Sequence, residues 1–262
     1  ILEDGYGINL LPLATFALNT YKDDPCTCFK LKGSNELNQY EVEVNLKMHK
    51  AISIIQFKAE GQLIKTHPEY HMEQRNLLHR IDYEHGTITL DMPDENGNLT
   101  PHTYDLLDTN FPTIDPKDPY AYTPIEADIM DRLSKAFLNC EKLQQHVKFL
   151  LAKGSLYKIY NRNLLYHGCI PLNEDGSFKA VDIYGKKYKG KALYEILEAY
   201  VRKAFVAIDE NEKEKGKDIL WFIWSSPGSP LFGKQKMATF ERYFLAEKET
   251  HEEKKNPYYR LL

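Results

Sequence analysis

The stretch that decides the fold is Asn163-Leu164-Leu165-Tyr166-His167-Gly168-Cys169-Ile170-Pro171, a short apolar run with one histidine that ends at a glycine and a proline. Its length and flanks predict a buried strand that ends in a loop. A histidine at a strand end can face a ligand, and neutral imidazole is the commonest protein ligand for transition metals. A hydrogen-bonded core histidine is the alternative, and the position on an apolar strand, taken alone, favours it. Gly168 allows a sharp turn and a close approach beside His167.

The composition is that of an ordinary globular chain with enough apolar residues for a core. Its 262 residues suffice for one large domain or two small ones, and 34 Lys and Arg against 38 Asp and Glu give a formal charge of −4. That balance excludes a general affinity for nucleic acid or anionic membranes. No segment has the apolar length needed to cross a bilayer.

The four cysteines are few for this length, so we expect reduced thiols in a cytoplasmic protein. Cys26-Thr27-Cys28 is too close-set for an easy disulfide and has no second Cys or His pair at zinc-site spacing. We therefore expect these two thiols to lie on the solvent side.

Residues 1–153 have mainly helical periodicity. The expected helices span residues 7–21, 37–59 and 124–153. Ser34 or Asn35 is the expected N-cap of the second helix, and Thr123 with Glu126 predicts a capping box for the third. Alternating residues on both sides of Asp94-Glu95-Asn96-Gly97 predict a β-hairpin over 86–106.

Strand patterns begin at Ser155, which places a domain boundary near Lys153. Beyond the His167 stretch we expect a hairpin over 178–187, a helix over 191–208, a solvated charged loop over 209–217, a buried run over 219–224 and a helix that starts at Thr239. The prediction is therefore an α+β fold divided into residues 1–153 and 154–262.

The loop from Ser225 to Lys234 contains serines, glycines and a terminal lysine. Backbone amides, hydroxyls and an ammonium of this kind can bind a phosphate. The glycine spacing is not that of a Walker loop, and composition favours a plain surface loop over a phosphate site.

The chain resembles a known family at several of these segments. Leu164-Leu165-Tyr166-His167-Gly168-Cys169-Ile170-Pro171 resembles the segment with which the phosphoprotein-phosphatase branch of the metallophosphoesterases supplies a metal-binding histidine. With Leu231-Phe232-Gly233-Lys234, Thr239-Phe240-Glu241-Arg242-Tyr243-Phe244 and Lys255-Asn256-Pro257-Tyr258-Tyr259, it is similar to the class III fructose-1,6-bisphosphatases of Firmicutes over nearly its whole length.

The resemblance implies part of a metallophosphoesterase α/β/β/α sandwich, with residues 1–153 as a mostly helical insertion and 154–262 as a partial metallophosphoesterase domain. It implies two divalent metals, usually manganese, and hydrolysis of the 1-phosphate of fructose 1,6-bisphosphate in gluconeogenesis. His167 would be one metal ligand, oriented by an acceptor for its other nitrogen. Lys234 and Arg242 would contact substrate phosphate, although an ion pair with a neighbouring glutamate is an equal alternative for Arg242.

Of the five metal-binding segments of that family, the sequence contains only the one at His167. We expect the others to lie outside residues 1–262, so that the chain is an internal piece of a longer enzyme, holds no complete catalytic set and is inactive alone. A homo-oligomer is possible for the whole enzyme.

A different class of function is also compatible with the residue pattern. The chain could be a non-catalytic helical interaction module whose aromatic-rich end docks a protein partner.

Overall fold

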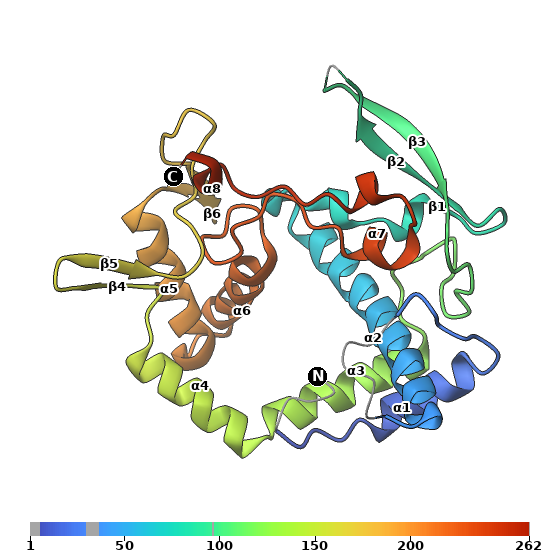
Figure 1. Ribbon diagram of the computed structural model, residues 1–262. Helices are drawn as coiled ribbons and strands as arrows, with labels where there is room; N and C mark the ends of the chain where they lie inside the picture. Colours follow the sequence, from blue (N-terminus) through green and yellow to red (C-terminus); the bar gives the residue numbers. More distant parts are fainter. Residues whose placement is uncertain (1–5, 30–36, 96, 262) are drawn as a thin grey trace. The chain divides into compact units, whose positions relative to one another are not determined.

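The computed structural model describes residues 6–29, 37–95 and 97–261 (Figure 1). Its helices are α1 (Leu11–Thr20), α2 (Gln39–Thr66), α3 (Pro124–Leu138), α4 (Glu141–Lys153), α5 (Lys191–Val206), α6 (Glu210–Ser225), α7 (Thr239–Phe244) and α8 (Tyr258–Leu261). Its strands are β1 (Ile81–Asp82), β2 (Thr87–Pro93), β3 (Leu99–Asp105), β4 (Tyr157–Tyr160), β5 (Asn163–Tyr166), β6 (Val181–Ile183) and β7 (Lys186–Tyr188). Short 3₁₀ turns lie at Pro68–Tyr70, Glu73–Arg75, Leu78–Arg80 and Lys248–His251.

This mixture of helices and strands confirms the α+β prediction. The described strands form three separate antiparallel sheets, in the orders β1-β2-β3, β4-β5 and β6-β7. Within the described ranges, no helix has the length and apolar character that crossing a membrane requires.

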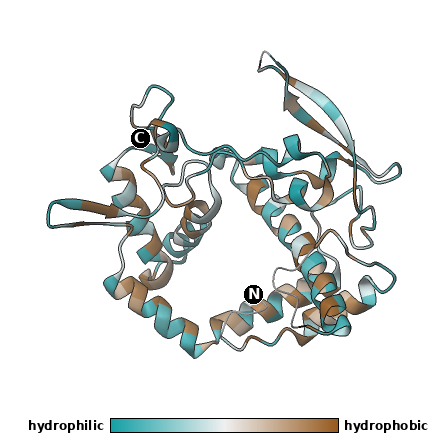
Figure 2. Ribbon diagram, in the orientation of Figure 1, coloured by the Kyte–Doolittle hydropathy of each residue, from teal (hydrophilic) through white to brown (hydrophobic). Residues whose placement is uncertain are grey.

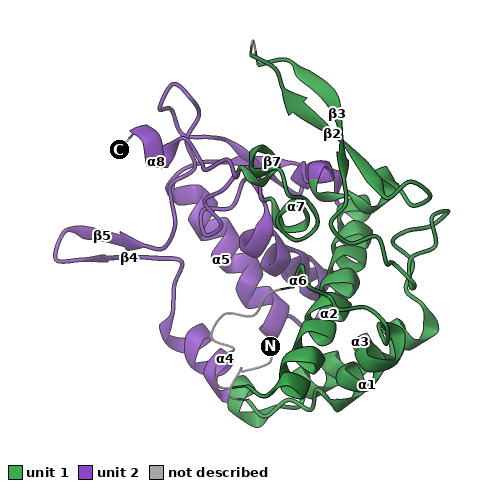
Figure 3. Cartoon of the chain, turned by 45° about the vertical axis from the view of Figure 1, so that its right-hand side comes forward, with its two compact units in different colours: residues 1–66, 75–144, 238–252 green, residues 67–74, 145–237, 253–262 purple. Residues whose placement is uncertain are grey.

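The chain forms two compact units, each assembled from separate stretches (Figure 3). Unit 1 contains residues 1–66, 75–144 and 238–252, and unit 2 contains 67–74, 145–237 and 253–262. The main division therefore falls inside α4, near the boundary expected at Lys153, but each unit also includes a segment distant in sequence. The assignment of residues 1–153 as an insertion remains a prediction.

Helix α2 is the centre of unit 1. Asn38 caps it, because the Asn38 side chain accepts a bond from Glu41 N and the Glu41 carboxylate accepts one from Asn38 N, each at 2.9 Å. The expected caps Ser34 and Asn35 lie outside the described residues. The core against α2 comes from α1, α3, α7 and the β1–β3 sheet and includes Leu13, Phe16, Ile54, Ile55, Ile88, Leu90, Ile129, Leu133, Phe240 and Phe244.

The predicted hairpin of unit 1 is confirmed. Strand β2 pairs with β3 from Thr87 opposite Asp105 to Pro93 opposite Leu99. Alternate residues of β2, namely Ile88, Leu90 and Met92, are buried, as expected for a sheet with one face on a core. Asn96 of the predicted turn lies outside the described residues.

Helix α2 also buries three lysines, Lys47, Lys50 and Lys58, that its hydrophobic pattern does not predict. The Lys50 ammonium lies 2.5 Å from Asp24 Oδ2 and 2.6 Å from Asp108 Oδ2, with exposed side-chain fractions of 0%, 6% and 9%. Burial alone would raise the pKa of Asp24, but hydrogen bonds from Lys50, Cys26 N and Asn110 outweigh it and lower that pKa. Cys26, expected on the solvent side, is buried beside this cluster.

Another of these lysines, Lys58, joins α2 to α3. Lys58 Nζ lies 2.7 Å from Glu126 Oε2 and donates to Thr113 O at 2.6 Å. Glu126 also accepts from Thr123 N at 2.8 Å, and its own amide donates to Thr123 Oγ1, which confirms the predicted capping box. One carboxylate therefore caps α3 and neutralises a buried ammonium.

The predicted third helix is wrong in one respect, because it is broken at Asn139 and continues as the separate helix α4. Only the α3 part has buried apolar residues, Ile129 and Leu133, whereas α4 has no fully buried residue. The prediction treated α3 and α4 as one helix because the same apolar periodicity continues through both. Only α3 packs in a core.

Unit 2 is built on α5 and α6. Gly216 of α6 lies so close to α5 that an added Cβ would be 2.3 Å from Ala204 N and 2.6 Å from Tyr200 O. The helix expected over 191–208 and the hairpin over 178–187 are confirmed by α5 and by β6–β7. The turn between β6 and β7 has positive φ at both Tyr184 and Gly185, as the two central residues of a type I′ hairpin turn require.

The loop expected over 209–217 is wrong, because these residues form the first half of α6. The Asp209 side chain accepts from Glu212 N at 2.9 Å as an N-cap, and Lys217 pairs with Glu214 on the exposed side. The buried run over 219–224 is the second half of the same helix, since a six-residue apolar run does not distinguish helix from strand.

The buried cluster at Lys50 predicts a large loss of stability on truncation. Lys50→Ala would leave Asp24 and Asp108 buried without their cation, so we expect a loss of about 3–5 kcal/mol. The matched control is Lys135→Ala, which removes an exposed pair with Asp131 and is expected to cost less than about 1 kcal/mol. Urea unfolding followed by circular dichroism measures both, and equal midpoints for the two variants would contradict the assigned role of Lys50.

Candidate functional site

His167 follows directly after β5, at the end of the β4–β5 hairpin of unit 2. The strand end was predicted correctly, but the expected burial of the strand is wrong: Leu164 is 49% exposed, Leu165 is 53% exposed and His167 is also exposed. The reason is that Leu164 and Leu165 lie on opposite faces of the hairpin, and the described residues leave about half of each side chain uncovered.

The backbone beside His167 is held tightly against the loop after α6. Gly168 has φ +83°, and an added Cβ would lie 2.2 Å from Pro230 O and 2.9 Å from Leu231 O. Cys169 N donates to Pro230 O at 2.8 Å, and the Tyr194 hydroxyl donates to Cys169 O at 2.9 Å. The predicted need for glycine at 168 is confirmed, because only glycine permits both this φ and this approach.

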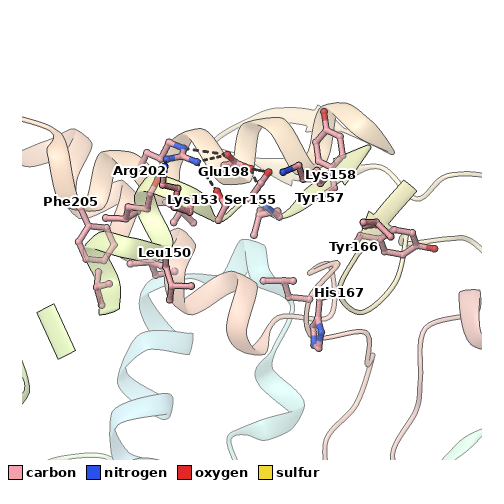
Figure 4. A pocket seen from close by; sticks show the side chains of 18 residues that line it. Leu150, Lys153, Ser155, Tyr157, Lys158, Tyr166, His167, Glu198, Arg202 and Phe205 are labelled. Carbon is pink, nitrogen blue, oxygen red and sulfur yellow. Dashed lines mark hydrogen bonds and ion pairs between the residues drawn. The ribbon is translucent and has the colours of Figure 1, made fainter. Parts of the chain in front are cut away.

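The His167 side chain itself is unpartnered among the described residues. It lines an open, mostly apolar pocket of about 760 Å³ in unit 2, with Leu165, Tyr166 and Leu231 among its neighbours (Figure 4). The acceptor expected for its second nitrogen is not found within the described part of the chain. Both ring nitrogens are therefore available to a ligand or to a further segment.

A polar cluster that the sequence analysis did not identify lies at another part of the same pocket. Glu198 accepts from Ser155 Oγ at 2.6 Å and pairs with Arg202 at 2.7 Å, as the dashed lines of Figure 4 show. Burial would raise the pKa of Glu198, but bonds from Ser155, Arg202 and Leu156 N outweigh it and lower the pKa. The i,i+4 spacing of Glu198 and Arg202 was the signal available in the sequence.

This cluster positions the start of the hairpin. Arg202 donates to Leu151 O and to Gly154 O, the latter at 3.2 Å, so it binds the last carbonyls of α4. Glu198 accepts from Leu156 N at 3.1 Å, immediately before β4. The arrangement fixes the chain between α4 and β4 to α5.

The Ser225–Lys234 loop does not have the free groups of a phosphate site. Ser226 and Ser229 are buried, and Ser229 Oγ donates to Ile223 O at 2.5 Å while accepting from Leu231 N and Phe232 N. The hydroxyls are used to cap α6 and shape the turn. The loop therefore differs from both predicted alternatives, a phosphate site and a plain surface loop, because two of its serines are buried and Ser229 is hydrogen-bonded within the fold.

The two predicted substrate residues lie in different compact units. Lys234 belongs to unit 2, where its ammonium lies 2.6 Å from Glu253 Oε2 and where the main chain at Lys234 bridges Lys255. Arg242 belongs to unit 1, on α7, with an exposed side chain. Their roles toward a substrate remain predictions.

Within the described ranges, no group of three or more His, Cys, Asp or Glu side chains converges as a metal site would require. His167 is therefore not part of a three-ligand cluster among the described residues, and its role as a metal ligand remains a prediction.

Comparison with known proteins gives a match over the full chain. Residues 1–262 match the family described as Firmicute fructose-1,6-bisphosphatase. Proteins named fructose-1,6-bisphosphatase class 3 are 52% identical in Clostridium novyi (strain NT) and 54% identical in both Alkaliphilus metalliredigens (strain QYMF) and Clostridioides difficile (strain 630). These matches cover 99–100% of this chain but 38% of each relative's length. No solved structure matches the chain.

The close packing at Gly168 predicts a specific loss of stability in unit 2. Gly168→Ala adds both left-handed strain and a collision with the Pro230 and Leu231 carbonyls. Gly185→Ala is the matched control, since Gly185 has φ +80° but open space around its Cβ position, and it should cost about 1–2 kcal/mol. We expect Gly168→Ala to cost at least about 1–3 kcal/mol more, measured by thermal unfolding; a smaller cost than that of Gly185→Ala would contradict the packing at Gly168.

Proposed function

The chain belongs to the Firmicute fructose-1,6-bisphosphatase family, and from this premise we propose that it forms part of a metal-dependent phosphatase. The complete enzyme hydrolyses the 1-phosphate of fructose 1,6-bisphosphate to fructose 6-phosphate and phosphate. The observation that carries the proposal is His167: an exposed imidazole without a partner among the described residues, at a strand end, on a main chain held by Gly168 and Cys169.

His167 fits the requirements of a metal ligand. A metal needs neutral imidazole with a free ring nitrogen on a rigid element, and rigidity here comes from the contacts of Gly168 and Cys169 with Pro230. A bound pair of divalent metals, manganese by analogy, would supply a nucleophilic water and stabilise phosphoryl charge. His167 would hold one of these ions.

The remaining ligands would come from parts of the full-length protein outside residues 1–262. The chain spans 38% of the length of its curated relatives, and its described residues contain no complete metal site. We therefore propose that residues 1–262 alone do not hydrolyse the substrate, and that the α/β/β/α sandwich of the metallophosphoesterases is formed only with the additional segments.

Lys234 is proposed as a contact for substrate phosphate. Its ion pair with Glu253 is partly exposed, with 31% and 16% of the two side chains accessible, and such pairs contribute little net stability. A doubly charged phosphate can therefore displace Glu253 at small cost. Arg242 is the second proposed phosphate contact and supplies a fixed positive charge from α7.

The role of His167 is tested in the full-length protein. His167→Ala should lower manganese-dependent hydrolysis of fructose 1,6-bisphosphate by more than about 100-fold, beyond the 10- to 100-fold typical of groups that only orient a ligand. His102→Ala, at an exposed strand histidine of unit 1, is the control and should leave the rate unchanged. Retained activity in His167→Ala would remove this residue from the metal site.

The role of Lys234 is tested by opposite changes at one ion pair. Lys234→Ala should raise KM for fructose 1,6-bisphosphate about 10- to 100-fold, as expected for the loss of a charged hydrogen bond. Glu253→Gln, which releases Lys234 without removing it, should leave KM equal or lower. If KM rises equally in both variants, the pair is structural and Lys234 does not bind phosphate; Arg242→Ala in the same assay tests the second cation.

A further inference from the structure

One side chain of α5 contacts the chain on both sides of His167. The Tyr194 hydroxyl donates to Cys169 O at 2.9 Å, two residues after the histidine. The Tyr194 ring also meets the ring of Tyr166, one residue before the histidine, edge to face with the centroids 6.3 Å apart. Tyr194 therefore holds the residues that flank the imidazole, and all of these residues belong to unit 2.

Tyr194 is itself fixed in place. It lies near the start of α5 and is only 4% exposed. The ring of Tyr157 packs edge to face against it with the centroids 5.7 Å apart, which is a favourable geometry for two aromatic rings. A buried side chain on a helix is a rigid base for a functional group. The Tyr194 hydroxyl therefore occupies a defined position relative to Cys169.

Apolar packing does not fix the strand that leads to His167. Most of β5 has hydrophobic colouring in Figure 2, but Leu164 and Leu165 are 49% and 53% exposed. The hydrophobic effect is also non-directional, whereas a hydrogen bond requires a particular alignment of donor and acceptor. The orientation of the chain at His167 therefore depends on hydrogen bonds more than on the apolar contacts of β5.

The hydrogen bonds at Cys169 supply this orientation. Cys169 N donates to Pro230 O at 2.8 Å, and Cys169 O accepts from Tyr194, so both of its main-chain polar groups are used. Gly168, between Cys169 and His167, is the residue type with the widest choice of backbone conformations. The imidazole keeps one direction only if the chain after this glycine is held.

Tyr194 acts from a different side of the hairpin than the one on which a ligand of His167 would bind. His167 lines the pocket of about 760 Å³, whereas Tyr194 lines another pocket of about 270 Å³. The Tyr166 ring, which Tyr194 contacts, points away from the imidazole (Figure 4). Tyr194 can therefore influence the imidazole through the main chain without touching its ligand.

We propose that the Tyr194 hydroxyl is a positioning group for His167, which holds the imidazole in the direction in which it binds the metal ion. This inference rests on the proposed function. Metal-binding histidines are usually oriented by a hydrogen bond at the second ring nitrogen. None of the described residues forms such a bond with His167. Its orientation must then come from the main chain, which Tyr194 holds.

Removal of one oxygen atom tests the proposal in the full-length protein. Tyr194→Phe keeps the ring and loses the bond to Cys169 O, so manganese affinity should fall about 10-fold, the lower end of the effect of groups that orient a ligand. At saturating manganese, turnover and KM for fructose 1,6-bisphosphate should return to the wild-type values. The electron paramagnetic resonance signal of unbound Mn²⁺ measures the affinity.

Tyr184→Phe is the matched control. The Tyr184 hydroxyl also donates to a main-chain carbonyl of unit 2, Lys215 O, at 2.8 Å, but from the β6–β7 turn. Its loss removes the same kind of bond without touching the residues around His167, so manganese affinity should be unchanged. Circular dichroism confirms that both variants are folded at the temperature of the titration.

Hydrogen exchange gives a readout that needs no metal. In the metal-free full-length protein, the amides of residues 163–172 should exchange about 10-fold faster in Tyr194→Phe than in the wild type, because local opening no longer breaks the bond to Cys169 O. Tyr184→Phe should leave the exchange of these amides unchanged.

The outcomes separate this inference from the proposed function. Wild-type manganese affinity in Tyr194→Phe, an equal loss of affinity in Tyr184→Phe, or unchanged exchange of residues 163–172 would each overturn the positioning role. If His167→Ala loses manganese affinity while Tyr194→Phe retains it, the proposed function stands and only the positioning role fails. If His167→Ala itself retains the affinity, the proposed function fails and the positioning role fails with it.

Discussion

The arrangement of unit 1 depends on the need to neutralise two ammonium groups on one helix that have no exposed surface at all. Lys50 and Lys58 lie two turns apart on α2, and neither has access to water. A buried charge is tolerated only when it is paired and hydrogen-bonded, so Asp24, Asp108 and Glu126 have to meet α2 in one arrangement. The segment after α1, the segment after β3 and the start of α3 are thereby placed by electrostatics as well as by apolar packing.

In unit 2 the main constraint is close packing of the main chain at Gly168. The close approach of Gly168 to Pro230 brings the end of β5 against the loop after α6. The Ser229 hydroxyl holds that loop to the end of α6 by donating to Ile223 O. Polar groups near this contact, such as Ser229 Oγ and Cys169 N, form hydrogen bonds within the fold. His167 differs, because it is placed by the same contact but has no partner among the described residues.

The β4–β5 hairpin and the imidazole after it are both accessible. Ile159 and Leu164 expose apolar surface, and the His167 ring has no partner among the described residues. The matched region is 38% of the length of its curated relatives, so these groups belong to a chain that matches part of longer proteins.

The sequence alone determined the elements whose signals are local. The capping box at Thr123, the 86–106 hairpin, the glycine requirement at Gly168 and the family itself were all identified from residue type and spacing, because each depends on neighbours within a few positions or on a recognisable segment. The position of His167 at a strand end belongs to the same group.

Only the tertiary structure decided which faces are buried and which charges are paired. Nothing local distinguishes the buried Lys50 from the exposed Lys135, because the carboxylate partners of Lys50 lie 26 and 58 residues away, whereas that of Lys135 lies four residues away. Likewise, the apolar pattern of β5 predicted burial, but burial requires a second surface, and the described residues leave Leu164 and Leu165 49% and 53% exposed. Hydrophobic pattern specifies what a strand can bury, whereas the packing partner determines whether it is buried.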